Sequence, residues 1–304
     1  MSLFQFESSL DVIDTLAIKN AHPRDANIKF DPIPHTYTIN NDTSIKYTSV
    51  TTWIHSHFSQ FDGDKIIDKI FVSKQWGPKH KYWGMSKAEI LQVWDKNRDE
   101  SAQAGTNMHY YIECFHNMTP TSPTSSTAAT YKDLYEYYKT TNNNLNPNLN
   151  PNPKPYQLLK EWEYFINYVK DYSAFVPYRT EWMVYHEELQ LSGSIDMVYE
   201  LPNGNLAIYD WKRAREIIQD DKFNQQSITK CINHIPDTNY WHYTMQLNIY
   251  KMILEEKYGK TVDELCLVVL HPNNFNGNYI LYPVPFITKE MKLLRKFRLA
   301  QLNK

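Results

Sequence analysis

Cysteine is scarce in this sequence. The 304 residues include three cysteines, Cys114, Cys231 and Cys266, which lie far apart and form no Cys-x-x-Cys pair. This usage excludes a disulfide framework and indicates a reducing compartment. It also falls short of the four thiolates that an iron–sulfur cluster usually needs, so no such cluster is expected.

Long apolar runs and an excess of one charge are also missing. No stretch has the length and apolarity of a membrane span, and residues 1–20 lack a signal-peptide pattern. We therefore expect a soluble, intracellular protein with no membrane partner. The formal net charge is -2, so any contact with nucleic acid has to come from a local basic surface.

What remains is the composition of a folded protein. Hydrophobic residues make up 42% of the chain, charged residues 22% and aromatic residues 14%. These values are typical of globular proteins rather than disordered ones. The length suits one large domain or two small ones.

Two strand-like runs, 192–199 and 206–212, flank a turn signal and predict a β-hairpin. Strand side chains repeat every two residues, so Asp210 and Lys212 continue the apolar face of the second run. Buried charges need a partner or a metal, and Asp196 on the first run is the nearest candidate. Two carboxylates beside an ammonium suit a hard cation and metal-assisted phosphodiester hydrolysis. The alternative is a surface hairpin whose charges face water.

The register of this hairpin decides between the two interpretations. A two-residue turn would put Asp196 and Asp210 on opposite faces of the sheet, where they could not share a cation. A three-residue loop at 203–205 shifts the pairing by one, so that Val198 opposes Asp210 and the acids share a face. We therefore expect an odd loop or a bulge, with Gly204 in the left-handed conformation.

A long helical pattern upstream carries a second group of candidates. It starts at Ser86, and His109 and Glu113, four residues apart, share one face of it. The histidine is either a metal ligand near the hairpin or a satisfied core residue. Glu181 lies on a predicted strand at 180–188, just before the hairpin.

The other predicted elements surround the hairpin. Residues 1–85 are expected to form a small hairpin (29–40 with 44–47) and helices that pack on the core. Residues 86–304 are expected to form that core, interrupted by a loop-rich insertion at about 117–155. Further patterns predict a helix at 240–258, strands at 265–270 and 279–284, and a last helix from Thr288.

Basic residues occur in three clusters. One includes Lys79 and Lys81, another includes Arg213 and Arg215, and a third lies on the last predicted helix. Each cluster either contacts phosphates or is a solvated face. We name the first two pairs as the candidate DNA-binding residues.

The order of the motifs resembles a known family. Gly-x-x-x-His on a helix is followed by a strand with Glu, a strand with Gly-x-x-Asp, a strand with Asp-x-Lys and a helix with Gln-x-x-x-Tyr. This order resembles the RecB-like branch of the PD-(D/E)XK nuclease superfamily, including lambda-type, CRISPR-associated and mitochondrial-maintenance exonucleases and their viral relatives. The resemblance covers roughly residues 105–270.

The resemblance implies a fold and a set of roles. The fold would be α/β, a mixed central β-sheet flanked by helices, in a restriction-endonuclease-like core with N-terminal helical additions. The catalytic residues would be Asp196, Asp210 and Lys212. The metal ligands would be His109, Asp196, Asp210 and the Trp211 carbonyl. Glu113 and Glu181 would support the metal ligands or be optional ligands themselves. Gln246 and Tyr250 would steady the site or contact the DNA backbone.

The implied activity is a Mg²⁺- or Mn²⁺-dependent exodeoxyribonuclease that acts on linear or single-stranded DNA ends in repair, recombination or replication. A structure-specific endonuclease, an RNase of the same fold and an inactive nucleic-acid-binding protein are the alternatives. The Asn-rich stretch at 140–155 hints at an AT-rich, viral genome.

Overall fold

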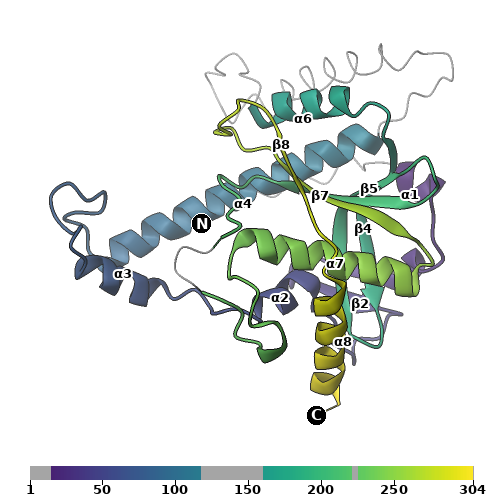
Figure 1. Ribbon diagram of the computed structural model, residues 1–304, viewed down its shortest axis with the longest axis horizontal. Helices are drawn as coiled ribbons and strands as arrows, with labels where there is room; N and C mark the ends of the chain where they lie inside the picture. Colours follow the sequence, from purple (N-terminus) through teal and green to yellow (C-terminus); the bar gives the residue numbers. More distant parts are fainter. Residues whose placement is uncertain (1–14, 118–159, 221–224, 304) are drawn as a thin grey trace.

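A mixed six-stranded sheet forms the centre of the molecule in the computed structural model, which describes residues 15–117, 160–220 and 225–303 (Figure 1). The strand order is β3-β5-β6-β7-β8, and β4 also pairs with β5. The β3–β5 and β6–β7 pairs are parallel and the others are antiparallel. The strands are β3 (Thr48–Ser49), β4 (Val176–His186), β5 (Leu191–Glu200), β6 (Leu206–Lys212), β7 (Val262–Val269) and β8 (Ile280–Pro283).

Helices cover both faces of the sheet, which confirms the predicted fold class (Figure 1). On one face, α2 (Val50–His55), α7 (Asn239–Lys257) and α8 (Thr288–Leu302) enclose a mainly aliphatic core. On the other face, α4 (Lys87–Asn117) and α6 (Lys160–Asp171) enclose a core rich in aromatic rings.

Strand β6 is central and almost completely buried. Ile208 packs into the aliphatic core, while Tyr209 and Trp211 pack into the aromatic one. Central strands flanked by helices are apolar on both faces. Asp210, which is 2% exposed, is therefore an unusual residue to find on this strand.

The N-terminal region contributes a hairpin and one strand of the sheet. The hairpin consists of β1 (Ile28–Asp31) and β2 (Thr36–Ile39), after the short helices α1 (Thr15–Lys19) and η1 (Asp25–Asn27). The prediction that 44–47 belongs to this hairpin was wrong. Strands β1 and β2 pair with each other across the turn at 32–35, and residues 44–47 are not part of either strand. The next strand, β3, pairs with β5.

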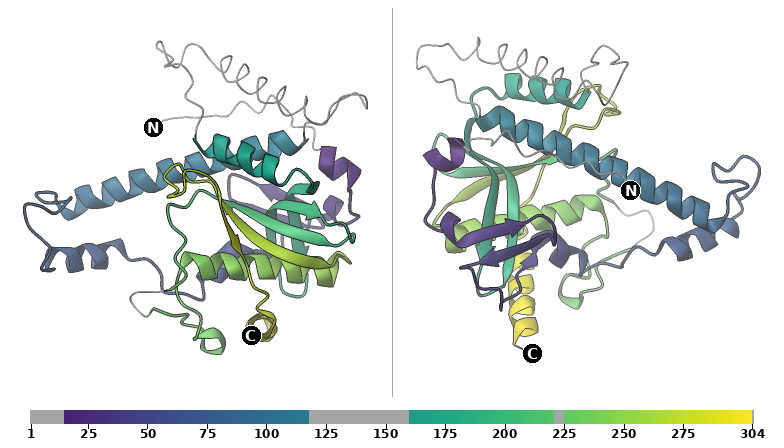
Figure 2. Two further views of the ribbon diagram at one scale, coloured as in Figure 1. Left: turned by 45° about the horizontal axis from the view of Figure 1, so that its top comes forward. Right: turned by 180° about the vertical axis from the view of Figure 1, so that it is seen from behind.

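A helical arm projects beyond the sheet (Figures 1 and 2). We define the arm as residues 63–94, which include α3 (Gly63–Phe71) and the first turns of α4, and its tip as the connecting residues 72–86. Ile67, Tyr82 and Ile90 form a small core of its own. The arm therefore packs largely on itself, while α4 continues into the body of the molecule.

The loop-rich insertion predicted at about 117–155 lies almost entirely outside the described residues. The short helix η2 (Lys230–Ile232) precedes α7. Within the described residues, no helix combines the length and apolarity needed to cross a membrane.

Candidate active site

The β5–β6 hairpin has an odd loop. Glu200 pairs with Leu206, and the Leu201 N–H donates to the Asn205 carbonyl at 2.8 Å, which leaves a three-residue loop at 202–204. Gly204 in this loop has a φ of 80°, which only glycine adopts readily. The odd loop and the left-handed glycine are confirmed.

The expected pairing within the hairpin was wrong by two residues. Val198 pairs with Ile208 rather than with Asp210. The loop starts at Pro202, one residue earlier than expected, and this moves the whole register. The shift preserves the alternation of faces, because two residues are one full period of a strand. If this register continued by one step beyond its last pair, Asp196 would oppose Asp210.

Strands β5 and β6 separate where the candidate residues begin. Their pairing ends at Met197 and Tyr209, while the pairing of β6 with β7 continues to Lys212. Beyond the end of the pairing, the Trp211 N–H donates to Oδ2 of Asp196 at 3.1 Å. A side chain thus replaces the backbone partner, and Asp196 is fixed beside β6.

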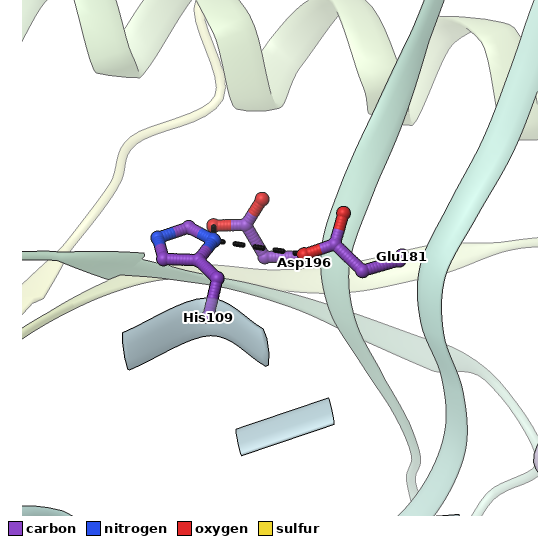
Figure 3. Close-up of side chains that lie close together, drawn as sticks. All are labelled: His109, Glu181 and Asp196. Atoms are coloured by element: carbon purple, nitrogen blue, oxygen red, sulfur yellow. Dashed lines mark ion pairs between the residues drawn. The ribbon is translucent and has the colours of Figure 1, made fainter. Parts of the chain in front are cut away.

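Helix α4 brings His109 to this point. Its Nε2 atom lies 2.9 Å from the Trp211 carbonyl oxygen. A carbonyl can only accept, so Nε2 carries the proton and Nδ1 is left to face the carboxylates. Nδ1 lies 3.5 Å from Oδ2 of Asp196 and 3.6 Å from Oε1 of Glu181 (Figure 3).

Glu181 reaches the site from β4 through an unusual backbone conformation. Its φ is 42°, in the left-handed region that residues other than Gly, Asn and Asp rarely adopt. Ser194 Oγ donates to Oε2 of Glu181 at 3.0 Å. Strained residues of this kind concentrate at functional sites because the surrounding structure has to hold them.

Three side chains could hold a metal ion together. Donor atoms of His109, Glu181 and Asp196 all lie within 4.8 Å of one another (Figure 3). Imidazole and carboxylate donors suit Mn²⁺ and related transition metals, and carboxylates suit Mg²⁺. The family resemblance left open whether Glu181 supports the metal ligands or is itself an optional ligand, and the structure brings its carboxylate within reach of the same ion as His109 and Asp196.

Asp210 and Lys212 lie next to this group and pair with each other. Lys212 Nζ is 2.6 Å from Oδ2 of Asp210. Among the described residues this oxygen, although buried, has no partner with hydrogen-bond geometry. Lys212 Nζ also lies 4.5 Å from the centre of the Tyr243 ring. We call His109, Glu181, Asp196, Asp210 and Lys212 the catalytic cluster, after the catalytic role that the sequence predicts for three of them.

The electrostatics of the catalytic cluster show unbalanced negative charge. Burial raises the pKa of Asp196 and, with the repulsion of Asp196, raises the pKa of Asp210 to about 7. Burial alone would lower the pKa of His109, but Asp196 and Glu181 outweigh it and raise that pKa to about 9. Burial opposes the charge on Lys212 as well, yet Asp210 and Asp196 raise its pKa. A divalent cation would relieve the repulsion between the acids.

Helix α7 covers the site from the aliphatic side and explains Gly193. A Cβ atom at this position would lie 2.7 Å from the Tyr250 hydroxyl, so only glycine leaves room for the ring. Gln246 Nε2 lies 3.5 Å from the same hydroxyl, at the limit of a hydrogen bond. Together with Tyr243 these residues recur at i, i+3 and i+7 on one helix face, a signal that could have revealed Tyr243 from the sequence.

A cavity of about 260 Å³ opens beside this helix face, between α2 and α7. Its lining includes His55, His242, Tyr243 and Gln246. Tyr243 also contacts the Lys212 ammonium, so the cavity adjoins the catalytic cluster.

The remaining predicted residues are not members of the catalytic cluster. Glu113 is half-buried one turn further along α4, outside the three-residue group found among the described residues. The Trp211 carbonyl accepts the His109 hydrogen bond, and its role as a ligand stays a prediction. Arg213 pairs with Glu161 on α6 at 2.7 Å, whereas Arg215 is exposed.

Comparison with known families identifies the chain. A model of the PD-(D/E)XK nuclease superfamily matches residues 83–295, more than two thirds of the sequence. The chain belongs to the PD-(D/E)XK nuclease superfamily. A search of curated proteins returned no significant match. The match includes every member of the catalytic cluster and supports a metal-dependent nuclease; the RecB-like branch stays a prediction.

Proposed function

We propose that this PD-(D/E)XK chain is a Mg²⁺- or Mn²⁺-dependent exodeoxyribonuclease of the RecB-like, viral type, acting on linear or single-stranded DNA ends in repair, recombination or replication. The observation that carries the proposal is the meeting of His109, Glu181 and Asp196 at the point where β5 and β6 separate. The Asp210–Lys212 pair lies beside them.

The metal would be held by the Nδ1 atom of His109 and by the carboxylates of Glu181, Asp196 and Asp210. The Trp211 carbonyl orients the imidazole, as outer partners of metal-binding histidines commonly do. The chemistry that a bound Mg²⁺ or Mn²⁺ supplies at such a site is a more acidic water and compensation of phosphate charge.

Lys212 would act through its charge. Its pKa is raised beside two carboxylates, so the ammonium keeps its proton at neutral pH. A protonated lysine donates hydrogen bonds and stabilises negative charge that develops on the phosphate, but it does not remove a proton from water. Its contact with the Tyr243 ring and its ion pair with Asp210 hold the ammonium in place.

The test is hydrolysis of defined substrates by the purified chain. End-labelled linear, circular and single-stranded DNA and RNA are incubated with Mg²⁺, Mn²⁺ or EDTA, with Asp210→Asn as the inactive control. We expect cleavage of linear and single-stranded DNA that needs the metal and spares circular duplex. Cleavage of closed circles would favour the endonuclease, and cleavage of RNA alone would favour the RNase. No metal-dependent cleavage of any substrate would refute the proposal.

Metal binding is tested separately from turnover. Calorimetric titration with Mn²⁺ should show binding to the wild type and its loss in Asp196→Asn. Removing one of several mutually repelling acids should leave the fold intact and raise the melting temperature of the metal-free chain. Unchanged Mn²⁺ affinity in Asp196→Asn would contradict the assignment of this ligand.

A further inference from the structure

The catalytic cluster does not attract a polyanion by itself. The three carboxylates of Glu181, Asp196 and Asp210 outnumber the two basic groups of the cluster, His109 and Lys212. The whole chain has a formal net charge of -2. Affinity for nucleic acid comes largely from lysine and arginine near phosphates. If the proposed function holds, the chain needs a basic surface outside the site.

In two of the predicted basic clusters, arginines form ion pairs or hydrogen bonds with other parts of the protein. Arg213 pairs with the buried Glu161. On α8, Arg295 pairs with Glu188, and the buried Arg298 donates to backbone carbonyls of the two residues that precede β5. These arginines hold elements of the protein together and have less capacity left for phosphates.

The tip of the arm is different in composition. Its 15 residues, 72–86, include Lys74, Lys79, His80 and Lys81 but no aspartate or glutamate. The three lysines are exposed. The tip is thus a local basic surface in a chain that has no overall excess of positive charge.

Aromatic rings are interleaved with these lysines and are held in place. The Trp76 ring lies 4.7 Å from Phe71 and 5.3 Å from Trp83, measured between ring centres. Trp94 Nε1 donates to the Tyr82 hydroxyl at 2.6 Å, which ties the tip to α4. Trp83 is 48% exposed. An exposed, supported ring beside lysines is the arrangement on which unpaired bases stack.

We propose that the tip is a second binding site for the single-stranded DNA on which the catalytic cluster acts, an inference that rests on the proposed function. Bases of the strand would stack on Trp83 while its phosphates lie against Lys79 and Lys81. Unpaired DNA is the ligand that fits, because paired bases offer no free ring face to an indole.

Helix α4 sets the distance between the two sites. It runs unbroken from Lys87, at the end of the tip, to Asn117, and carries His109 on the way (Figure 1). The 22 steps from Lys87 to His109 correspond to about 33 Å at 1.5 Å per residue. A stacked strand advances about 3.4 Å per nucleotide, so about ten nucleotides span this distance. Shorter strands would reach only one site.

The test compares the binding of short and long strands by the full chain in Mn²⁺, which offsets the acids of the catalytic cluster. Every protein in the comparison carries Lys212→Ala, which should slow hydrolysis and leave DNA affinity unchanged, and the chain with this single change serves as the wild type of the comparison. Fluorescein-labelled single strands of 6 and 20 nucleotides are titrated at several KCl concentrations, with fluorescence anisotropy as the readout. The wild type should bind the 20-mer at least about tenfold more tightly than the 6-mer. Lys79→Ala/Lys81→Ala and Trp83→Ala should each remove most of this preference. The lysine pair should also reduce the salt slope by about 1 to 2.

Three controls make the result specific. Lys289→Ala/Lys292→Ala removes the same charge from exposed positions on α8 and should bind the 20-mer like the wild type. Trp83→Phe should keep the preference because it keeps a ring. Melting temperatures show whether the tip variants are folded. Wild-type affinity in the folded tip variants, or an equal loss in the α8 control, would overturn the proposal.

Hydrolysis of the 20-mer with Mn²⁺ by the chain that keeps Lys212 separates this inference from the proposed function. Tip-dependent binding without hydrolysis would refute the nuclease assignment and leave the binding site standing. Hydrolysis with tip-independent binding would refute the second site alone.

Discussion

Two groups of acids and bases lie a few residues apart along β4 and differ in their balance. In the first, Arg179 donates to Oδ2 of Asp25 at 2.7 Å, and Trp182 Nε1 donates to Oδ1 of the same acid at 2.9 Å. Arg24 pairs with Glu187 at 2.8 Å. Each acid has its own arginine, and we call these residues the structural cluster. The catalytic cluster begins at Glu181, two residues after Arg179.

The pKa shifts separate the two clusters. Burial would raise the pKa of Asp25, but hydrogen bonds from Arg179, His22 and Trp182 lower it, and Arg24 does the same for Glu187. Burial and mutual repulsion raise the pKa of Asp196 and Asp210 instead. Charge that stabilises the fold is balanced within the protein, whereas charge left unbalanced marks a functional site.

The largest difference between the clusters should appear in turnover. Lys212→Ala is expected to lower turnover by about a hundred- to a thousandfold, because one charge-stabilising donor is lost at the phosphate. DNA affinity should change little. Lys257→Ala, which breaks the ion pair with Glu188 on the surface, is the matched control and should retain activity. Near-normal turnover by folded Lys212→Ala would remove this lysine from the mechanism.

A substitution in the structural cluster should lower the stability of the fold and leave the metal site unchanged. Arg179→Met leaves Asp25 without its cation and is expected to lower the free energy of unfolding by about 3 kcal/mol, measured by urea denaturation. Mn²⁺ affinity of the folded protein should be unchanged. Adding Asp25→Asn to this variant should restore part of the loss. A loss of Mn²⁺ affinity in Arg179→Met would show that the two clusters are coupled.

The two clusters should also respond to pH with opposite sign. The pKa of Asp210 rises from 3.8 to about 7 on folding, so its stabilising contribution in the metal-free chain is present at low pH and is lost as pH rises through about 7. The pKa of Asp25 is lowered on folding, so its stabilising contribution is present at neutral pH and is lost on acidification.

Asp210→Asn tests this difference by urea denaturation in EDTA. The variant should be more stable than the wild type at pH 7.5, and this gain should shrink by about 2 kcal/mol at pH 5. A gain that does not depend on pH would show that the repulsion between the acids is absent.

The smallest effect concerns packing behind the catalytic cluster. Gly193→Ala brings a methyl group against the Tyr250 hydroxyl and is expected to cost about 1 to 2 kcal/mol of unfolding free energy, with a several-fold loss of turnover. Gly77→Ala on the tip is the control for stability alone, because no heavy atom lies within 4 Å of its added Cβ. Equal stability of the two variants would mean that Tyr250 moves aside freely.

Most of the fold that could be predicted from the sequence was predicted from local patterns. The alternation in β6, the turn at Gly204 and the long periodic stretches of α4 and α7 are short-range signals, and the sheet follows from them. The exact register was not predicted, because Pro202 belongs to the loop and the alternation of apolar residues does not show where the loop starts.

Long-range relations were harder to predict. Asp25 and Arg179 are separated by 154 positions, and neither belongs to a motif. The place of Glu181 among the donor atoms depends on a left-handed backbone that glutamate does not favour by itself. The catalytic candidates were recognisable because their order along the chain matched a family. Their geometry depended on tertiary contacts.

The backbone at Glu181 has a consequence for redesign and for sorting related chains. A left-handed glutamate costs about 1 kcal/mol relative to glycine. A procedure that optimises sequence on this backbone for stability alone would choose glycine or asparagine at position 181 and would erase a carboxylate of the site without disturbing the sheet. Among related chains, a glutamate at this position therefore indicates selection for the reaction, whereas glycine or asparagine indicates selection for the stability of the fold alone.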